Sequence, residues 1–309
     1  MYNSNVKKQA FGEKMLNVVL ILFNIVLYTL QTLLYKMFGD KYPGEKKYIA
    51  YVYSVFLGFS TVLISLIFGG FNIEFNPLTL LLGALNAVAS FLYYLTVYYA
   101  SKNGPYSVVM VFSIAGGISI PVLTSFIALG ETPSVLKILC FAVIFVGAYF
   151  VTKKPSENMG IQNKKAFFIA VFSLAVVNGI YGGLINLQQA YTGEGQKDEM
   201  IMYTFLIAGI FSFVFLLIKK RGEVFLSFKQ TRSSFLFMLG AALSSGFAIN
   251  MLVIIAKYID VNLLWTFNNS GVLVLSVIAS ALIFKEKLTV TNIVACGAIA
   301  VTLVAVSFV

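Results

Sequence analysis

Neutral polar side chains stand inside otherwise apolar stretches of this chain, at spacings that bring them onto one helix face. Asn24, Tyr28 and Gln31 are four and three residues apart and share such a face, and Lys36 follows on roughly the same side. Amide and phenol groups bind polar molecules through hydrogen bonds, and an ammonium attracts carboxylates or phosphates. These residue types therefore predict recognition of a small polar ligand and not covalent chemistry.

A second polar stripe stands about 155 residues later. Asn178, Tyr181 and Gln188 lie close to one face of their helix. Because buried polar groups need a partner, two such stripes predict opposite walls of one cavity, with hydrogen bonding between helices and no ligand as the alternative. The other predicted substrate-binding residues come from four further stretches: Tyr94, Ser113, Asn250, Asn268 and Asn269.

Charged residues stand mostly at the ends of the apolar stretches. Glu131, Asp260 and Glu286 all have end positions, so no carboxylate is expected at the middle of a membrane. The expected substrate is therefore neutral, zwitterionic or anionic. Lys36 either reaches the cavity and attracts an anion or extends its ammonium to the lipid headgroups. The two glutamates are expected to cap or turn the chain before the stretches that follow them.

The chain contains no histidine and only two cysteines, Cys140 and Cys296. Zinc sites, Ser-His-Asp triads and Cys-His dyads are thereby excluded. Two cysteines in the middle of apolar stretches do not form a disulfide framework. Since the sequence offers neither a paired acid nor a metal cluster at membrane depth, we expect no intramembrane enzyme and no cofactor.

Composition places the chain among membrane proteins. Hydrophobic residues make up 59% of it and charged residues 11%, whereas soluble domains contain about 25% charged residues. The net charge is +10, but Lys and Arg are spread between the apolar runs, so nucleic-acid binding is not expected. Stretches near the length of about 20 apolar residues that crosses a bilayer occur at 15–36, 48–70, 78–100, 105–129, 134–152, 165–190, 200–218, 233–256, 261–284 and 288–309.

The second half of the chain repeats the first. Phe112 recurs as Phe267 and Asn24 as Asn178, each about 155 residues later. Each half holds five apolar stretches, and an odd number inserts the second copy upside down relative to the first. The prediction is an all-α integral membrane protein with ten transmembrane helices, arranged as two five-helix inverted repeats. The predicted parts are a first repeat at 1–152, a linker at 153–164 and a second repeat at 165–309.

Glycine and proline mark two special places in this pattern. Pro121 lies midway along the fourth stretch, beside Gly116 and Gly117, and predicts a kink there. Gly179 and Gly183 in the sixth stretch form a small-xxx-small pair, which predicts close approach to another helix.

Two runs of sequence resemble a known family. One follows Ala100 after three intervening residues and reads GPYSVVMVFSIAGGISIPVLTSFIALGETPS. The other begins at Ala256 and reads AKYIDVNLLWTFNNSGVLVLSVIASALIFKEKLT. With Glu131 and Glu286 at matching turns, they resemble the EamA-type branch of the drug/metabolite transporter superfamily, over nearly the whole chain as two copies. The resemblance implies a ten-helix fold in which spans 1–4 and 6–9 surround a central cavity and spans 5 and 10 pack outside.

The same resemblance implies transport of a small metabolite, an amino acid, a nucleotide-linked sugar or a drug. Together with the polar stripes it predicts a secondary carrier or exchanger that works by alternating access. The alternative is a non-transporting membrane scaffold or receptor-like protein. The expected partners are a small-molecule substrate and the lipid bilayer, and a homodimer is left open.

Loop charge and family resemblance disagree about orientation. Most of the 22 Lys and Arg residues stand on the odd-numbered loops between stretches, so the positive-inside rule puts both termini outside. The family resemblance implies termini in the cytoplasm. In either orientation, we expect a multi-pass protein of a plasma or inner membrane.

Overall fold

The computed structural model describes residues 2–69, 73–130, 142–143, 146–147, 161, 163–192, 196–219, 232–256, 258, 261–288 and 290–306. All regular structure in these residues is helical, so the described part of the chain has an all-α fold. The elements are α1 (Tyr2–Lys41), η1 (Lys46–Tyr48), α2 (Ile49–Phe68), α3 (Pro77–Asn103), α4 (Tyr106–Leu129), α6 (Lys164–Thr192), α7 (Lys197–Lys219), α9 (Arg232–Ile255), α10 (Val261–Ile283) and α11 (Val290–Val306).

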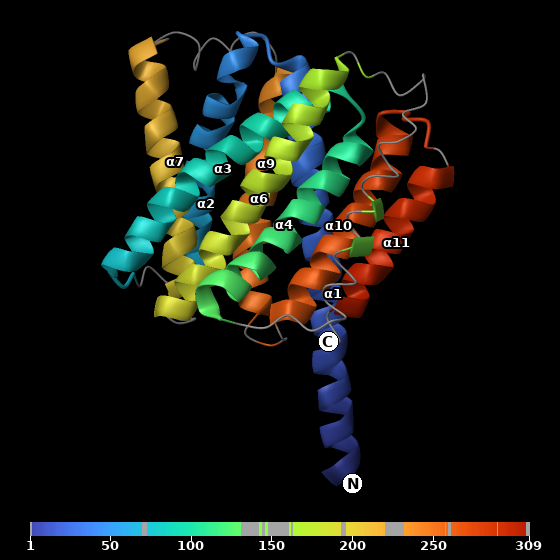
Figure 1. Ribbon diagram of the computed structural model, residues 1–309. Coiled ribbons are helices and arrows are strands. Elements are labelled where there is room, and N and C mark those ends of the chain that lie inside the picture. The colour runs from blue at the N-terminus through green and yellow to red at the C-terminus, as the bar shows by residue number, and fades with distance from the viewer. Residues whose placement is uncertain are drawn as a thin grey trace.

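These helices coincide with the expected apolar stretches, with one clear difference at the start. The first stretch was expected from residue 15, whereas α1 begins at Tyr2 and projects from the bundle at its N-terminal end (Figure 1). No proline interrupts this polar segment, so helical hydrogen bonding continues through it. The stretch expected at 134–152 and the linker expected at 153–164 lie almost wholly outside the described residues.

Local sequence fixes where α3 and α4 begin and end. Asn76 caps α3, because its side-chain oxygen accepts from the N–H groups of Leu78 and Thr79 at 2.9 and 3.2 Å. Pro77 follows in the first turn, where its missing N–H leaves no bond unmade. Gly130 ends α4 with a φ of 70°, a left-handed conformation that glycine adopts without strain.

Seven helices in the described residues are long and apolar enough to cross a membrane, including α1 from Leu16 onward. Two further apolar stretches, Phe267–Ile283 and Ile293–Thr302, are shorter. Large apolar side chains cover the outer surface, among them Ile127, Phe172 and Ile218. Such a surface is unfavourable in water and suits lipid. The described helices therefore suggest a multi-pass membrane protein.

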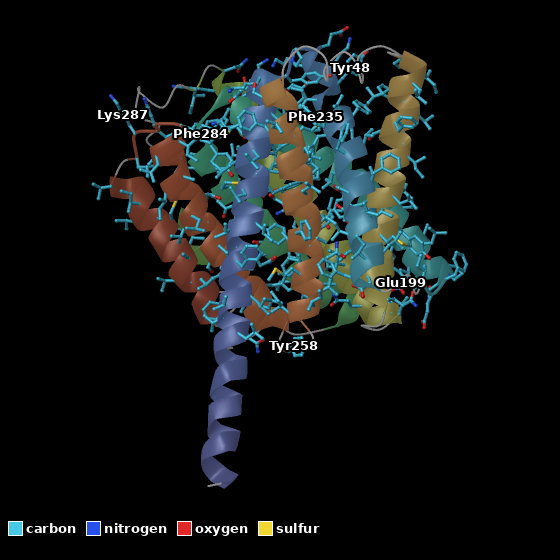
Figure 2. The ribbon with its side chains drawn as sticks, turned by 180° about the vertical axis from the view of Figure 1, so that it is seen from behind. Tyr48, Glu199, Phe235, Tyr258, Phe284 and Lys287 are labelled. Carbon is cyan, nitrogen blue, oxygen red and sulfur yellow. The ribbon has the colours of Figure 1, made fainter. Side chains whose placement is uncertain are left out.

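The helices pack in crossed pairs. α1 packs on α9, α3 packs on α6, and α2 packs on α7 (Figures 1 and 2). At the crossing of α2 and α7, a Cβ atom added to Gly58 would lie 2.7 Å from the Cα of Gly209. Two facing glycines therefore let these two backbones touch.

The α4–α6 interface confirms the close approach predicted for the sixth stretch. A Cβ added to Gly179 would lie 2.5 Å from Ile120, and one added to Gly183 would lie 2.7 Å from Thr124. From the opposite helix, Gly116 packs directly against backbone atoms of α6. The absence of side chains at these positions brings α4 and α6 together.

Pro121 lies within α4, which stays a single helix from Tyr106 to Leu129. α6 packs a glycine against it, since a Cβ on Gly182 would lie 2.8 Å from the proline ring. Asn186 donates to the Pro121 carbonyl at 3.4 Å. α6 thus packs against the proline of α4 through one glycine and one amide.

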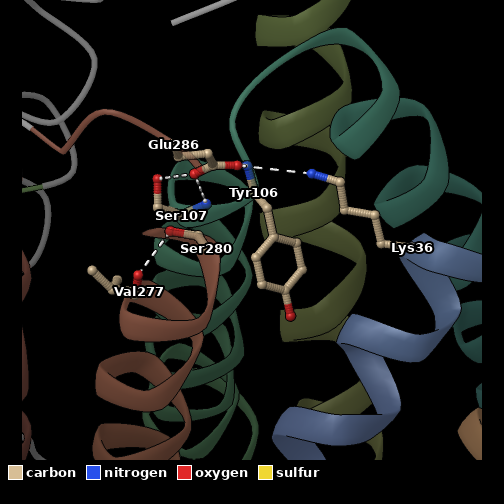
Figure 3. A network of polar contacts seen from close by, with 6 residues as sticks. All are labelled: Lys36, Tyr106, Ser107, Val277, Ser280 and Glu286. Carbon is tan, nitrogen blue, oxygen red and sulfur yellow. Dashed lines mark hydrogen bonds and ion pairs between the residues drawn. The ribbon is translucent and has the colours of Figure 1, made fainter. Parts of the chain in front are cut away.

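The bundle has two ends, which we name by residues labelled in Figure 2 or Figure 3. At the Glu286 end, α1, α3 and α10 finish and α2 and α4 begin; at the Tyr258 end, α6 and α9 finish and α7 and α10 begin. Lys287 and Tyr48 mark the first end in Figure 2, and Tyr258 and Glu199 mark the second.

Candidate functional site: a central polar cavity

A cavity of about 180 Å³ lies among α1, α3, α4, α6, α7, α9 and α10. One enclosed water needs only ~15 Å³ on the same kind of measure, so a small organic molecule fits. Most of its polar lining is amide and aromatic: Tyr28, Gln31, Asn86, Tyr93, Tyr94, Asn178, Tyr181, Gln188, Gln189, Trp265, Asn268 and Asn269. The described residues that line it include no Asp, Glu, Lys or Arg.

Most of the residues predicted to bind substrate line this cavity. They are Tyr28, Gln31, Tyr94, Ser113, Asn178, Tyr181, Gln188, Asn268 and Asn269. Asn24, Lys36 and Asn250 do not belong to its wall. Contact of any of these residues with a substrate remains a prediction.

The predicted residues outside the wall each have another partner. Asn24 is fully buried and donates to Asn268 Oδ1 at 3.1 Å, so it supports a wall residue from behind. Asn250 donates to the carbonyl of Gly246 on its own helix at 2.8 Å. Lys36 lies closer to the Glu286 end, where its ammonium is 3.8 Å from Glu286 Oε1.

The cavity extends toward the Tyr258 end only. Its wall includes Gln189 near the end of α6, Ala256 just after α9 and Trp265 near the start of α10. Toward the Glu286 end, the last wall residue of α1 is Thr32 and the first of α4 is Met110. The cavity therefore reaches from the middle of the bundle toward one end and stops short of the other.

Residues of α1, of α4 and of the segment between α10 and α11 close the Glu286 end. Thr32 forms a short hydrogen bond with the Tyr106 hydroxyl, directly beyond the cavity. Glu286 then accepts from the N–H of Tyr106 at 2.5 Å and from the N–H and hydroxyl of Ser107 at 3.2 and 2.9 Å (Figure 3). Lys36 pairs with the same carboxylate at 3.8 Å. We call Lys36, Tyr106, Ser107 and Glu286 the clasp.

Elementary electrostatics explains the clasp. The first N–H groups of α4 have no helical partner and carry partial positive charge, so a carboxylate is favourable there. The Lys36 ammonium adds a second cationic group and lies 3.8 Å from the centre of the Phe284 ring. Glu286 was expected to cap or turn the chain before the stretch that follows it; it lies between α10 and α11, and its carboxylate caps α4. Glu131 lies outside the described residues.

Hydrogen bonds hold much of the polar wall in place. Gln31 donates to the Tyr94 hydroxyl at 2.8 Å. Asn178 donates to the Ser113 carbonyl at 2.7 Å. Gln188 donates to Thr192 at 2.6 Å. The first bond joins α1 to α3, the second joins α6 to α4, and the third lies within α6, so several helices together hold the wall.

Some wall residues lie outside the set predicted to bind substrate. Asn86, Ser90 and Tyr93 stand four and three residues apart, so helical spacing was the signal that could have placed them together. Thr204 is different, because the residues three and four positions away on either side of it in α7 are all apolar, so no spacing pattern marks it. Among the described residues, no cluster of His, Cys, Asp or Glu suits a metal ion. Cys296 is a buried free thiol, and Cys140 lies outside the described residues.

Comparison with solved structures finds the same overall fold in a protein known from its crystal structure, whose description names no function. The TM-score is 0.64 and the sequence identity 13%, over 94% of this chain and 95% of the other. At this identity the likeness shows the fold alone. No family model matches the sequence, and no curated protein is significantly similar to it.

Proposed function

We propose that this protein is a secondary carrier or exchanger of a small polar molecule. Its ten membrane helices would form two inverted five-helix repeats, with the substrate site between them and access alternating between the two ends. The observation that carries the proposal is the central cavity, lined by polar side chains from both halves of the chain. The resemblance of two runs to EamA-type transporters agrees with it, as does a plasma or inner membrane location.

Matching hydrogen bonds support the inverted repeat. Asn24 corresponds to Asn178, and Asn268 corresponds to Ser113, each about 155 residues apart. Asn24 is bonded to Asn268, and Asn178 is bonded to Ser113. The same two repeat positions are therefore joined twice, each time by a bond between one half of the chain and the other.

Helix packing has the same symmetry. In the proposed repeat, α1 corresponds to α6, α2 to α7, α3 to α9 and α4 to α10. The packing of α1 on α9 then matches that of α6 on α3, and the packing of α2 on α9 matches that of α7 on α3. Because the proposed symmetry exchanges α2 and α7, their mutual contact is its own counterpart, and Gly58 packs against Gly209 in that contact. A pseudo-two-fold axis would pass near these glycines.

The one-sided cavity supports alternating access. The cavity extends toward the Tyr258 end, while Thr32, Tyr106 and the clasp close the Glu286 end. In the proposed cycle the clasp opens and contacts form at the Tyr258 end, which exposes the same site to the other side of the membrane. An ion pair at the boundary of the bundle suits this role, since its partners can each be hydrated when they separate.

A scaffold or receptor-like protein is the second candidate, because a receptor also needs a ligand cavity. The two candidates differ in whether bound solute crosses the membrane. Counterflow of radiolabelled solutes into proteoliposomes that contain the full chain distinguishes them. A carrier exchanges internal unlabelled solute for external label, whereas a receptor binds without exchange.

Two variants of α6 sharpen that experiment. Tyr181→Ala removes a ring from the cavity wall and should reduce exchange strongly. Tyr191→Ala is the control: its side chain, on the same helix, is 62% exposed, and exchange should be unchanged. If no solute of a broad panel is exchanged by protein that is folded and correctly inserted, the carrier proposal is wrong. Equal loss in both variants would also count against the proposed site.

A further inference from the structure

The cavity wall has no charged group to balance an ionised substrate. The described residues that line it supply amides, hydroxyls, phenols and one indole. Bringing an ion into a low-dielectric site without a counter-charge is costly, and carriers of ions place such a charge near the substrate. This wall therefore favours a substrate without ionised groups.

Lys36 does not change that conclusion. Its ammonium faces Glu286 Oε1 at 3.8 Å and the Phe284 ring, with a side-chain exposure of 11%. Thr32, one turn earlier on α1, forms the cavity wall and bonds to Tyr106. The Lys36 ammonium is thus engaged beyond the cavity.

Four buried wall residues have a side-chain oxygen without a partner in the described part of the chain: Gln31, whose amide nitrogen already donates to Tyr94, and three residues that lie closer together. Asn86, Gln188 and Thr204 are at most 1% exposed, and each has a side-chain oxygen without a partner in the described part of the chain. Leaving a buried polar group unpaired is costly, so a ligand that bonds to it gains affinity. We call Asn86, Gln188 and Thr204 the unpaired group.

The fold brings the unpaired group together around α3. Gly83, one turn before Asn86, packs against α7. A Cβ atom added to it would lie 3.5 Å from the backbone nitrogen of Thr204. Thr79, two turns before Asn86, donates to Thr192 at 3.4 Å, and Thr192 is the hydrogen-bond partner of Gln188. α3 therefore lies against both helices that carry the other two members.

The orientation of the Gln188 amide is fixed by its neighbour. Thr192 donates its hydroxyl proton to the Gln188 backbone carbonyl at 2.8 Å, so the same hydroxyl can only accept from the Gln188 side chain. The amide nitrogen must therefore face Thr192, which leaves the amide oxygen as the free group. Gln188 offers an acceptor, whereas the Thr204 hydroxyl can donate or accept.

Aromatic side chains form the rest of the recognition surface. Tyr28, Tyr93, Tyr181 and Trp265 all line the cavity. Their rings can pack against the C–H face of a compact skeleton, while amides and hydroxyls bond to polar substituents around it. A hydroxyl group both donates and accepts, which matches the mixed character of the unpaired group.

We propose that the molecule recognised in this cavity is uncharged and hydroxyl-bearing, of monosaccharide or cyclic-polyol size, with Asn86, Gln188 and Thr204 bonding to its hydroxyls. This inference deepens the proposed function and depends on it only for the transport step. Binding itself is measurable without transport, because Trp265 is the only tryptophan of the chain and lines the cavity.

The first experiment titrates the purified full chain in detergent while following Trp265 fluorescence. Glucose, glucuronate and glucosamine share one ring in neutral, anionic and cationic form, and inositol and xylitol add neutral polyols. We expect a saturable response to one or more neutral members at about tenfold lower concentration than to the charged ones. A tighter response to a charged member overturns the proposal, as does no response to any neutral member.

Variants test the role of the unpaired group. Gln188→Glu puts a negative charge at the free acceptor, so it should weaken binding of the neutral sugar about tenfold and make glucosamine the tighter ligand. Asn103→Asp adds the same charge outside the cavity wall and should change neither affinity. Thr204→Val removes only a hydroxyl and gives a second test if Gln188→Glu does not fold. Unchanged affinities in folded Gln188→Glu and Thr204→Val would refute the assignment.

The two proposals fail in different ways. Exchange of a charged solute with no binding of neutral ones would refute the substrate class and leave the carrier standing. Binding of a neutral hydroxylated probe without exchange of any solute would refute the carrier and leave the binding site standing.

Discussion

Asn178 donates its side-chain N–H to the backbone oxygen of Ser113 at 2.7 Å and ties α6 to α4. At the positions that correspond to them in the proposed repeat, Asn24 donates to Asn268 at 3.1 Å and ties α1 to α10. Each bond gives a partner to a side-chain amide within an apolar bundle, which explains why polar residues stand at these four positions. The polar wall of the cavity and the proposed internal symmetry thus depend on the same contacts.

The first prediction concerns the Asn24–Asn268 bond. Asn24→Ala and Asn268→Ala should each lower stability by about 1–3 kcal/mol, because each leaves a buried partner unpaired. The double variant should cost less than the sum of the two, with a coupling of about 0.5–3 kcal/mol. Thermal or denaturant unfolding in detergent measures all four states of the cycle.

A second cycle provides the control for the first. Asn250 is bonded to its own helix at Gly246, and no contact with Asn24 is expected from that arrangement. Effects of Asn24→Ala and Asn250→Ala should therefore add. Additive effects in the Asn24–Asn268 cycle as well would show that these two side chains do not interact in the folded protein.

The second prediction compares two glycine substitutions of opposite sign. Gly58→Ala should destabilise the bundle, since the new Cβ would lie 2.6 Å from the Phe205 carbonyl oxygen and must push α2 away from α7. Gly297→Ala should be neutral or stabilising by up to about 1 kcal/mol, because no atom lies within 4 Å of its Cβ position and alanine favours helix. The midpoints of thermal or denaturant unfolding measure the stability of the two variants. Equal effects of the two substitutions would contradict the close contact of α2 and α7.

Helix positions and polar faces were predictable from the sequence because both depend on local spacing. The stripe of Asn24, Tyr28 and Gln31 follows from a period of 3.6 residues, and Tyr28 and Gln31 do line the cavity. The small pair Gly179 and Gly183 likewise marked the α4–α6 contact. Residue spacing alone is sufficient where the feature to be predicted is which residues share one face of a helix.

Partners across the fold were not predictable in this way. The spacing placed Lys36 on the side of the polar stripe, but its position depends on Glu286, which the chain brings close only through the packing of α10 and α4. Asn24 shares the same face and yet lies behind the wall, because Asn268 covers it. Periodicity gives the direction of a side chain, whereas tertiary packing decides whether a cavity, a carboxylate or another amide stands opposite.

The third prediction tests the clasp as the closure of the Glu286 end. Glu286→Ala leaves the first N–H groups of α4 and the Lys36 ammonium without their carboxylate, so the closed arrangement loses stability. In a background of Cys140→Ser and Cys296→Ser, a cysteine at Thr32 should then react several-fold faster than with Glu286 intact when a membrane-impermeant maleimide is supplied only from the Glu286 side of sealed vesicles. Glu45→Ala, whose ion pair with Lys47 is surface-exposed, is the matched control and should not alter the rate. An unchanged rate in Glu286→Ala would exclude the clasp as a gate.

The fourth prediction is that transport does not depend on a membrane-embedded carboxylate. Among the described residues none of the cavity wall is acidic, and Glu286 lies in the clasp at a helix end. Vesicles that contain the Glu286→Gln or the Glu131→Gln variant should therefore respond to an imposed pH gradient as vesicles with the unmodified protein do. At most, the rate of uptake should change. Normal folding combined with loss of pH-driven accumulation in either variant would place the coupling site at that glutamate.

The last prediction concerns orientation in the membrane. Lys46, Lys102, Lys285 and Lys287 stand beside helix ends at the Glu286 end, and the positive-inside rule puts this end in the cytoplasm. The cavity, which extends toward the Tyr258 end, would then face the outside in the state described. In a background of Cys140→Ser and Cys296→Ser, Tyr258→Cys should react with a membrane-impermeant maleimide in intact cells, and Lys287→Cys should react only after the membrane is opened. Because Tyr258 is 69% exposed, its reactivity does not depend on local unfolding. The reverse labelling pattern would place both termini in the cytoplasm, as the family resemblance implies, and would turn the cavity of this state toward the cell interior.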